Sequence, residues 1–175
     1  MRHATAESFS DGTIYSAYGD APAFAARADW LIGQYGTAGR WLIAGCGWGF
    51  LVQALRARGV DAYGVDASAW AIAQAPLEIQ GRLSVGDCAD ASAMAQLGAF
   101  AVVVTEDMLP MAESEAEVAA VLAALRPIAG RLCHIVTMEH PGDQHTAALL
   151  WRDGDGWAAL VAPDDLICAC DVRIA

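Results

Sequence analysis

An apolar run that leads directly into a glycine-rich turn is the feature that most restricts what this chain can fold into. The run covers residues 41–44 (WLIA), and the turn covers residues 45–49 (GCGWG). Beyond the turn, apolar residues recur at helical spacing as far as Leu55, and Gly59 can end the helix. A short, continuous apolar run is typical of a strand buried on both faces of a parallel sheet. We therefore predict a strand, a tight turn and a helix in this order.

The rest of the chain alternates in the same way. We predict strands over residues 60–65, 83–85, 100–105 and 131–138, and helices over residues 69–75, near 89–97, and from the acidic residues 113–117 to Pro127. Residues 166–174 are a further candidate strand, for which an antiparallel direction is one option. This alternation predicts an α/β fold with a doubly wound, mostly parallel, twisted sheet and helices on both faces. At this length we expect one domain over residues 1–175.

Composition argues against several classes of protein. The net charge of −11 disfavours a nucleic-acid partner, because it repels phosphate groups. No apolar run approaches the roughly 20 residues that cross a bilayer, so we expect no membrane partner and a cytoplasmic location. The five cysteines include no Cys-x-x-Cys pair, and the four histidines have no acidic partner at a recognised metal-ligand spacing. We expect reduced thiols and no metal site.

An acidic residue ends the second predicted strand. Asp66 stands about 20 positions after the start of the turn, where an acid in a doubly wound sheet can accept both hydroxyl hydrogens of a ribose. The glycine turn lets a ligand come close to backbone N–H groups at the start of a helix. Two structural alternatives stay open. The glycines can simply end the strand, and Asp66 can be a helix cap, a role for which Ser68 competes.

In these residues the chain resembles the class I (Rossmann-like) S-adenosylmethionine-dependent methyltransferase family. The matching stretches are residues 42–49 (LIAGCGWG), 62–67 (AYGVDA), 85–88 (VGDC) and 100–106 (FAVVVTE), in the family's order and spacing. The resemblance implies that S-adenosyl-L-methionine is the cofactor and that residues of these stretches and of the N-terminal segment contact it. These residues are Gly45, Cys46, Gly47, Trp48, Gly49, Asp66, Ala67, Asp87, Cys88, Thr105 and Tyr15.

The resemblance also distributes parts of the cofactor among these residues. It implies that the glycines of the turn line the methionine end, that Asp66 takes the ribose hydroxyls and that Asp87 lies beside the adenine amino group. Tyr15 and Tyr18 belong to an N-terminal segment that folds over the cofactor in many relatives. A ring there can stack near the charged sulfonium, with ordinary packing as the alternative.

Two positions bear on how the cofactor is held and which cofactor it is. Family members often carry an acid two places before the first glycine, where it helps to hold the amino group of the cofactor, but this chain has Ile43 there. Either the backbone or another side chain holds that amino group, or the affinity for the cofactor is reduced. A dinucleotide fingerprint would need a glycine where Phe50 stands, which argues against NAD or FAD.

Candidate catalytic residues follow the fourth and fifth predicted strands. Glu106, with Asp107, lies at the edge of the sheet that borders cofactor and substrate in the family, and a solvated loop is the alternative. His140 can serve as a general base because the reference pKa of histidine is near neutrality, and a plain loop histidine is the alternative.

The expected function is methyl transfer to a small or uncharged acceptor, which is a small molecule or a protein. The chain is short, so either short loops or a second subunit, as in a homodimer, would complete the acceptor pocket. One competing hypothesis is a non-catalytic S-adenosylmethionine-binding regulatory or partner subunit, which the isoleucine at position 43 favours. A second is an enzyme that cleaves S-adenosylmethionine, and a third is an NAD-dependent oxidoreductase, which Phe50 disfavours.

Overall fold

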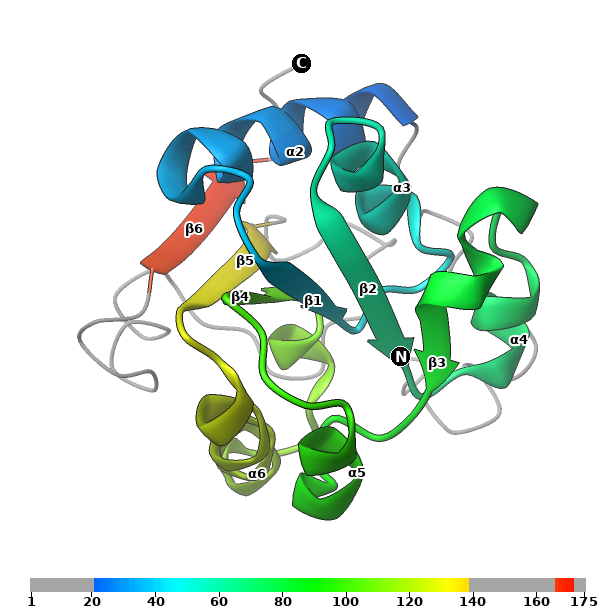
Figure 1. Ribbon diagram of the computed structural model, residues 1–175. Helices are drawn as coiled ribbons and strands as arrows, with labels where there is room; N and C mark the ends of the chain where they lie inside the picture. The colour runs from blue at the N-terminus through cyan, green and yellow to red at the C-terminus, as the bar shows by residue number, and fades with distance from the viewer. Residues whose placement is uncertain (1–20, 139–165, 172–175) are drawn as a thin grey trace.

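A parallel sheet forms the centre of the protein. The computed structural model describes residues 21–138 and 166–171, and within these ranges six strands form one sheet. The strands are β1 (Arg40–Ala44), β2 (Asp61–Asp66), β3 (Leu83–Val85), β4 (Val102–Glu106), β5 (Leu132–Met138) and β6 (Leu166–Asp171). Their spatial order is β3-β2-β1-β4-β5-β6, so the direction of winding reverses at β1 (Figure 1).

Helices cover both faces of this sheet. They are α2 (Ala21–Tyr35), α3 (Phe50–Arg56), α4 (Ala69–Ala73), α5 (Ala91–Gln96) and α6 (Glu115–Leu125), with short 3-10 helices η2 (Leu77–Arg82), η3 (Leu109–Met111) and η4 (Arg126–Ile128). Figure 1 shows α2 and α3 on one face and α5 and α6 on the other. The predicted doubly wound α/β architecture is therefore confirmed.

The last strand, β6, is parallel to its neighbour and not antiparallel, which was one option for residues 166–174. β6 pairs with β5 in parallel, from Cys133 opposite Leu166 to Met138 opposite Asp171, so the antiparallel option is not realised. A parallel neighbour needs a crossover of about a dozen residues or more. Residues 139–165, which join the two strands, exceed that length, whereas a short turn would have imposed an antiparallel pair.

Two apolar layers flank the sheet, and β1 contributes to both. Trp41 and Ile43 pack in the layer that contains α2 and α3, whereas Leu42 and Ala44 pack in the layer that contains α5 and α6. All four side chains are buried, as is typical of a central parallel strand. The carboxyl end of this strand is thus fixed from both sides, which gives the turn that follows it a rigid base.

The helix α2 was not predicted. Its first and last turns carry no acidic and no basic residue, respectively, so the usual charge signals of a helix end are missing. Phe24, Ala28 and Leu31 are buried at helical spacing, and this spacing is the signal that could have found the helix.

Candidate functional site

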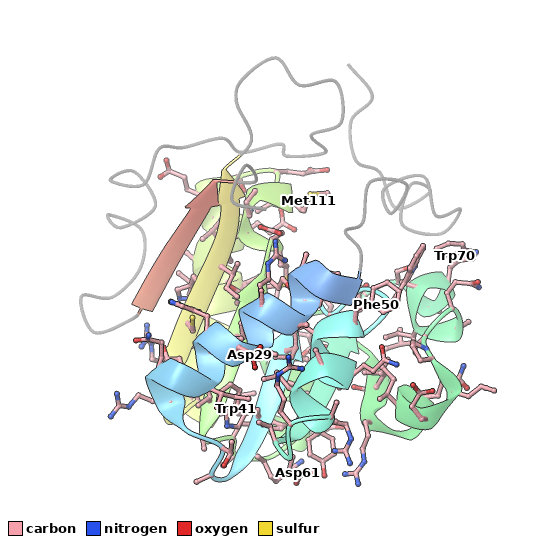
Figure 2. All side chains as sticks on the ribbon, turned by 90° about the horizontal axis from the view of Figure 1, so that it is seen from above. Asp29, Trp41, Phe50, Asp61, Trp70 and Met111 are labelled. Carbon is pink, nitrogen blue, oxygen red and sulfur yellow. The ribbon has the colours of Figure 1, made fainter. Side chains whose placement is uncertain are left out.

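The candidate site lies at the carboxyl ends of the central strands. Figure 2 shows this end of the sheet, with Phe50, Trp70 and Met111, opposite the end at which Trp41 and Asp61 lie. Ligand sites of open α/β sheets lie outside the carboxyl ends of the strands, at the point where strand order reverses. That point is β1 here, so the glycine turn stands at the centre of the candidate site.

The turn after β1 has backbone conformations that residues with side chains rarely adopt. Gly45, Gly47 and Gly49 have φ angles of 75°, 52° and 78°. A Cβ atom on Gly45 would lie 2.7 Å from Cβ of Met108, and one on Gly49 would lie 2.7 Å from Cδ1 of Ile79. The glycines are therefore required by the turn itself, and at these two positions also by the side chains packed against it.

Asp66, at the end of β2, holds this turn in place. Its Oδ2 accepts a hydrogen bond from Gly47 N at 2.8 Å, and its Oδ1 accepts one from Ser68 N at 2.8 Å. The side chain of Ser68 accepts a hydrogen bond from Ala71 N at 3.1 Å and caps α4. Since Ser68 is the cap, Asp66 is not needed for that role, and its carboxylate ties the end of β2 to the turn after β1.

A row of aromatic rings borders the turn. The rings of Trp48 and Phe50 meet edge to face with centroids 5.7 Å apart, and those of Trp48 and Trp70 lie 6.2 Å apart. Phe50 also packs against Phe24 of α2, with centroids 5.6 Å apart. Phe50 therefore fills the start of α3, the position at which a dinucleotide fingerprint needs glycine.

The end of β4 carries a buried acid. Glu106 is 5% exposed, and its Oε1 accepts a hydrogen bond from Nη1 of Arg27, on α2, at 2.6 Å. Within the part of the chain that the structure describes, Oε2 of Glu106 is buried and has no hydrogen-bond partner. Burial raises the pKa of Glu106 from its ordinary value of 4.5 to about 7, although the nearby Arg27 cation opposes the rise. Glu106 is therefore not part of a solvated loop.

The residues on either side of Glu106 are also constrained. The hydroxyl of Thr105 lies 2.8 Å from Nδ1 of His134, which is its partner on β5, and both side chains are buried. The Thr105 side chain is thus engaged within the fold, and Thr105 pairs with Ala44 on β1 and with His134 on β5. Asp107 has a positive φ of 49°, a conformation that aspartate adopts more readily than most residues and that is often found at functional sites.

The two cysteines predicted to contact the cofactor are buried thiols. Burial raises the pKa of Cys46 well above its usual range, and the carboxylates of Asp66 and Glu106 raise it further. Burial also raises the pKa of Cys88 to about 12. Thiols in such surroundings stay protonated near neutral pH, so neither cysteine is suited to be a nucleophile.

The structure brings most of the predicted site residues to one edge. Asp66 and Glu106 end the strands on either side of β1, and the exposed Asp87 follows β3. Tyr15 and His140 lie outside the described residues, so their roles stay predictions. Among the described side chains, no group of three or more histidines, cysteines or acids is arranged to hold a metal ion.

Three residues at this edge were missed. Arg27 is 79 residues from Glu106 in the sequence, so no local pattern indicates their ion pair. Met108 lies two residues beyond the end of β4 and packs on Gly45, a contact that the sequence does not indicate. His134 interrupts an apolar strand, and a polar residue in a buried strand does signal that a hydrogen-bond partner lies nearby.

Comparisons with known proteins bear on the fold. No protein-family model and no curated relative matches the sequence. The structure is similar to that of the magnesium protoporphyrin IX methyltransferase of Synechocystis PCC 6803 with bound S-adenosylmethionine, with 22% identity, a TM-score of 0.54 and coverage of 68% of this chain and 64% of that one. An amino pentose methyltransferase from Micromonospora echinaspora matches with 21% identity, a TM-score of 0.54 and coverage of 70% and 53%. An S-adenosylmethionine-dependent methyltransferase from Clostridium acetobutylicum matches with 15% identity, a TM-score of 0.53 and coverage of 69% and 52%.

The chain has the fold of these methyltransferases. The glycine turn, Asp66 and Glu106 lie at the carboxyl ends of β1, β2 and β4. In this fold the strand order reverses at β1, and ligands of open α/β sheets bind beside that point. The chain spans about half to two thirds of the length of these solved structures. None of the helices in the described ranges is long and apolar enough to cross a membrane.

Proposed function

We propose that this chain is an S-adenosylmethionine-dependent methyltransferase that acts on a small or uncharged acceptor. The observation that carries the proposal is the Asp66 carboxylate, which is bonded to Gly47 N and Ser68 N at the reversal point of a methyltransferase fold. Because one fold can host many activities, the proposal rests on this site and not on the architecture alone.

The described residues fit the cofactor. The turn presents Gly45, Gly47 and Gly49 without side chains, so a ligand can come close to its backbone. The Asp66 carboxylate is fixed beside the turn by hydrogen bonds from Gly47 N and Ser68 N, and a carboxylate can accept both hydroxyl hydrogens of a ribose. Asp87 is exposed after β3, the neighbour of β2, and we assign it to the adenine amino group together with the main chain of Cys88.

Bound S-adenosylmethionine supplies an activated methyl group. The chain has to place the acceptor atom in line with that methyl, and such positioning can provide much of the rate. A base is required only where the acceptor atom must lose a proton, and Glu106 and His140 are our candidates for that role. Glu106 suits proton transfer near neutrality because burial raises its pKa to about 7.

A small acceptor is supported by charge and by the similar proteins. The net charge of −11 disfavours nucleic acid, and two of the similar structures are named for a magnesium porphyrin and for an amino pentose as substrates. Short loops or the second subunit of a homodimer would complete the acceptor pocket. We place this activity in the cytoplasm.

Calorimetric titration of the purified chain with S-adenosylmethionine, S-adenosylhomocysteine and NAD tests the cofactor. We expect the first two to bind and Asp66→Ala to weaken them by about tenfold or more, equivalent to about 1.4 kcal/mol. Asp61→Ala is the matched control, because Asp61 is the same residue type at the opposite end of the same strand. Its affinities should equal those of the wild type. Absence of binding by the wild type, or binding of NAD instead, contradicts the proposal.

Product analysis with candidate acceptors tests the reaction. A methylated acceptor supports a methyltransferase. Cofactor fragments without an acceptor would show a cleaving enzyme, and tight binding without turnover across the acceptors would favour a regulatory or partner subunit.

A further inference from the structure

Glu106 has a buried acceptor atom for which the described residues provide no donor. Arg27 Nη1 donates to Oε1 at 2.6 Å, whereas Oε2 has no hydrogen-bond partner among the described residues. A buried carboxylate oxygen that lacks a donor is unfavourable, and such an atom in a folded protein requires an explanation. A ligand that brings a donor, above all a cationic one, would supply what is missing.

Strand register places Asp66 and Glu106 on the two sides of the glycine turn. Ala44 ends β1 and pairs with the residues that directly precede Asp66 on β2 and Glu106 on β4. The ends of β2 and β4 are two strand spacings apart, roughly 10 Å. Both carboxylates also raise the pKa of the Cys46 thiol, which belongs to the turn. A ligand whose ribose binds at Asp66 can therefore extend across the turn towards Glu106.

Glu106 lies on the same face of the sheet as Ile43, the β1 residue that stands where related proteins often have an acid. Ile43 is buried in the layer of α2 and α3, and its partner Val104 on β4 packs in the same layer. Successive side chains of a strand alternate between faces, so Glu106, two residues after Val104, continues that face. Its ion pair with Arg27 of α2 agrees with this position. The anionic group beside the turn on this face is therefore supplied by β4.

We propose that Oε2 of Glu106 binds the ammonium group of the methionine moiety of S-adenosylmethionine. This inference rests on the proposed function. The ammonium group loses water when the cofactor binds, and a cation that leaves water needs an anionic partner. Arg27 is then a positioning residue, because it holds Oε1 and so orients the carboxylate. This role differs from proton removal, and the experiment below separates the two.

Binding of an ammonium group at Oε2 of Glu106 requires a local movement of the protein. Oε2 is covered in this structure, so the ammonium group can reach it only after such a movement.

Two ligands distinguish the ammonium site from the rest of the cofactor. S-adenosylhomocysteine carries the amino acid, and 5′-methylthioadenosine shares the adenosine and sulfur but lacks the amino acid. By calorimetry at pH 8, we expect Glu106→Gln to weaken S-adenosylhomocysteine by about tenfold or more and to leave 5′-methylthioadenosine unchanged. Asp66→Ala should weaken both ligands. Glu113→Gln, which alters an exposed acid, should change neither.

The pH dependence of the wild type gives a second readout that needs no variant. The charged or titratable described groups around Glu106 are Arg27 on α2, Asp107 after β4 and Cys46 in the turn. Since the pKa of Glu106 is about 7, the carboxylate ionises between pH 6 and pH 8. We expect the affinity for S-adenosylhomocysteine to rise over this range and that for 5′-methylthioadenosine to stay constant. This comparison decides the question if Glu106→Gln does not fold.

The outcomes that overturn the inference are distinct from those that overturn the proposed function. If Glu106→Gln binds S-adenosylhomocysteine as well as the wild type does, or weakens both ligands equally, the ammonium role is wrong while the cofactor assignment stands. Equal pH profiles for the two ligands have the same meaning. If the wild type binds neither ligand at any pH, the proposed function fails and this inference fails with it.

Discussion

Replacing Glu106 with glutamine should stabilise the folded protein, relative to the wild type, by more at pH 8 than at pH 5. Burial raises the pKa of this carboxyl in the folded state to about 7, whereas the unfolded chain keeps the ordinary value of 4.5. Between these values the folded state binds the proton more tightly than the unfolded state does. The stabilising contribution of the protonated group is therefore complete below about pH 4.5 and is lost as the pH rises through 7.

The size of the effect follows from the two pKa values. At 1.36 kcal/mol per pH unit, a rise in pKa from 4.5 to about 7 corresponds to about 3 kcal/mol when both states are ionised. About 2–3 kcal/mol of this develops between pH 5 and pH 8. Glutamine has nearly the same shape and keeps a carbonyl oxygen that can accept the hydrogen bond from Arg27, but it carries no charge. The variant therefore lacks the cost of burying the ionised group.

Urea unfolding at several pH values between 5 and 8 measures this difference. The free energy of unfolding of Glu106→Gln minus that of the wild type should grow by about 2–3 kcal/mol over the range. Glu113→Gln, which changes an exposed acid, is the matched control. If the difference for Glu106→Gln stays constant, or if the wild type gains relative stability as the pH rises, the reasoning is refuted. The second result would mean that the ion pair with Arg27 outweighs the cost of burial.

Two further predictions concern the turn. Gly49→Ala should lower the free energy of unfolding by about 1–3 kcal/mol, because φ is 78° and the new Cβ would meet a side chain at 2.7 Å. Gly33→Ala, inside α2 with open space around it, should raise that free energy by about 0.5–1 kcal/mol. Urea unfolding measures both variants, and a change of the same sign in both would contradict the requirement for glycine at position 49. Because burial raises its pKa, Cys46 should resist iodoacetamide at pH 8 in the native protein and react after unfolding, as followed by peptide mass spectrometry. Equal labelling in both states would show that the thiol is accessible.

Features with a pattern inside a few residues could be predicted from the sequence. The strand at residues 83–85 has the predicted bounds. Ser68 caps α4, the helix that was predicted to begin directly after this serine. Both depend on neighbouring residues, namely a short apolar run and a hydroxyl at the start of a helix. The closeness of the glycine turn and Asp66 could also be predicted from the order of neighbouring elements. A β-α-β unit brings the ends of two parallel strands together within one crossover.

Pairings between distant segments could not be predicted. The contact of Arg27 with Glu106 requires that α2 lie over β4, and the sequence gives no measure of that packing. The raised pKa of Glu106 follows from the same packing, so an exposed acid and a buried one looked alike in the sequence. The hydrogen bond between Thr105 and His134 depends on the register of β4 against β5, which a polar residue in a strand suggests but does not fix.

Two contacts beside the glycine turn close loops of the chain that differ greatly in length. The bond from Gly47 to Asp66 closes 19 residues, and the ion pair from Arg27 to Glu106 closes 79. The longer closure costs about 1 kcal/mol more in chain entropy, so the contact of α2 with β4 should form after the β-α-β unit and open before it. On the roles proposed for Asp66 and Glu106, a chain that is only partly folded would therefore recognise a nucleoside before it could recognise an amino acid attached to it.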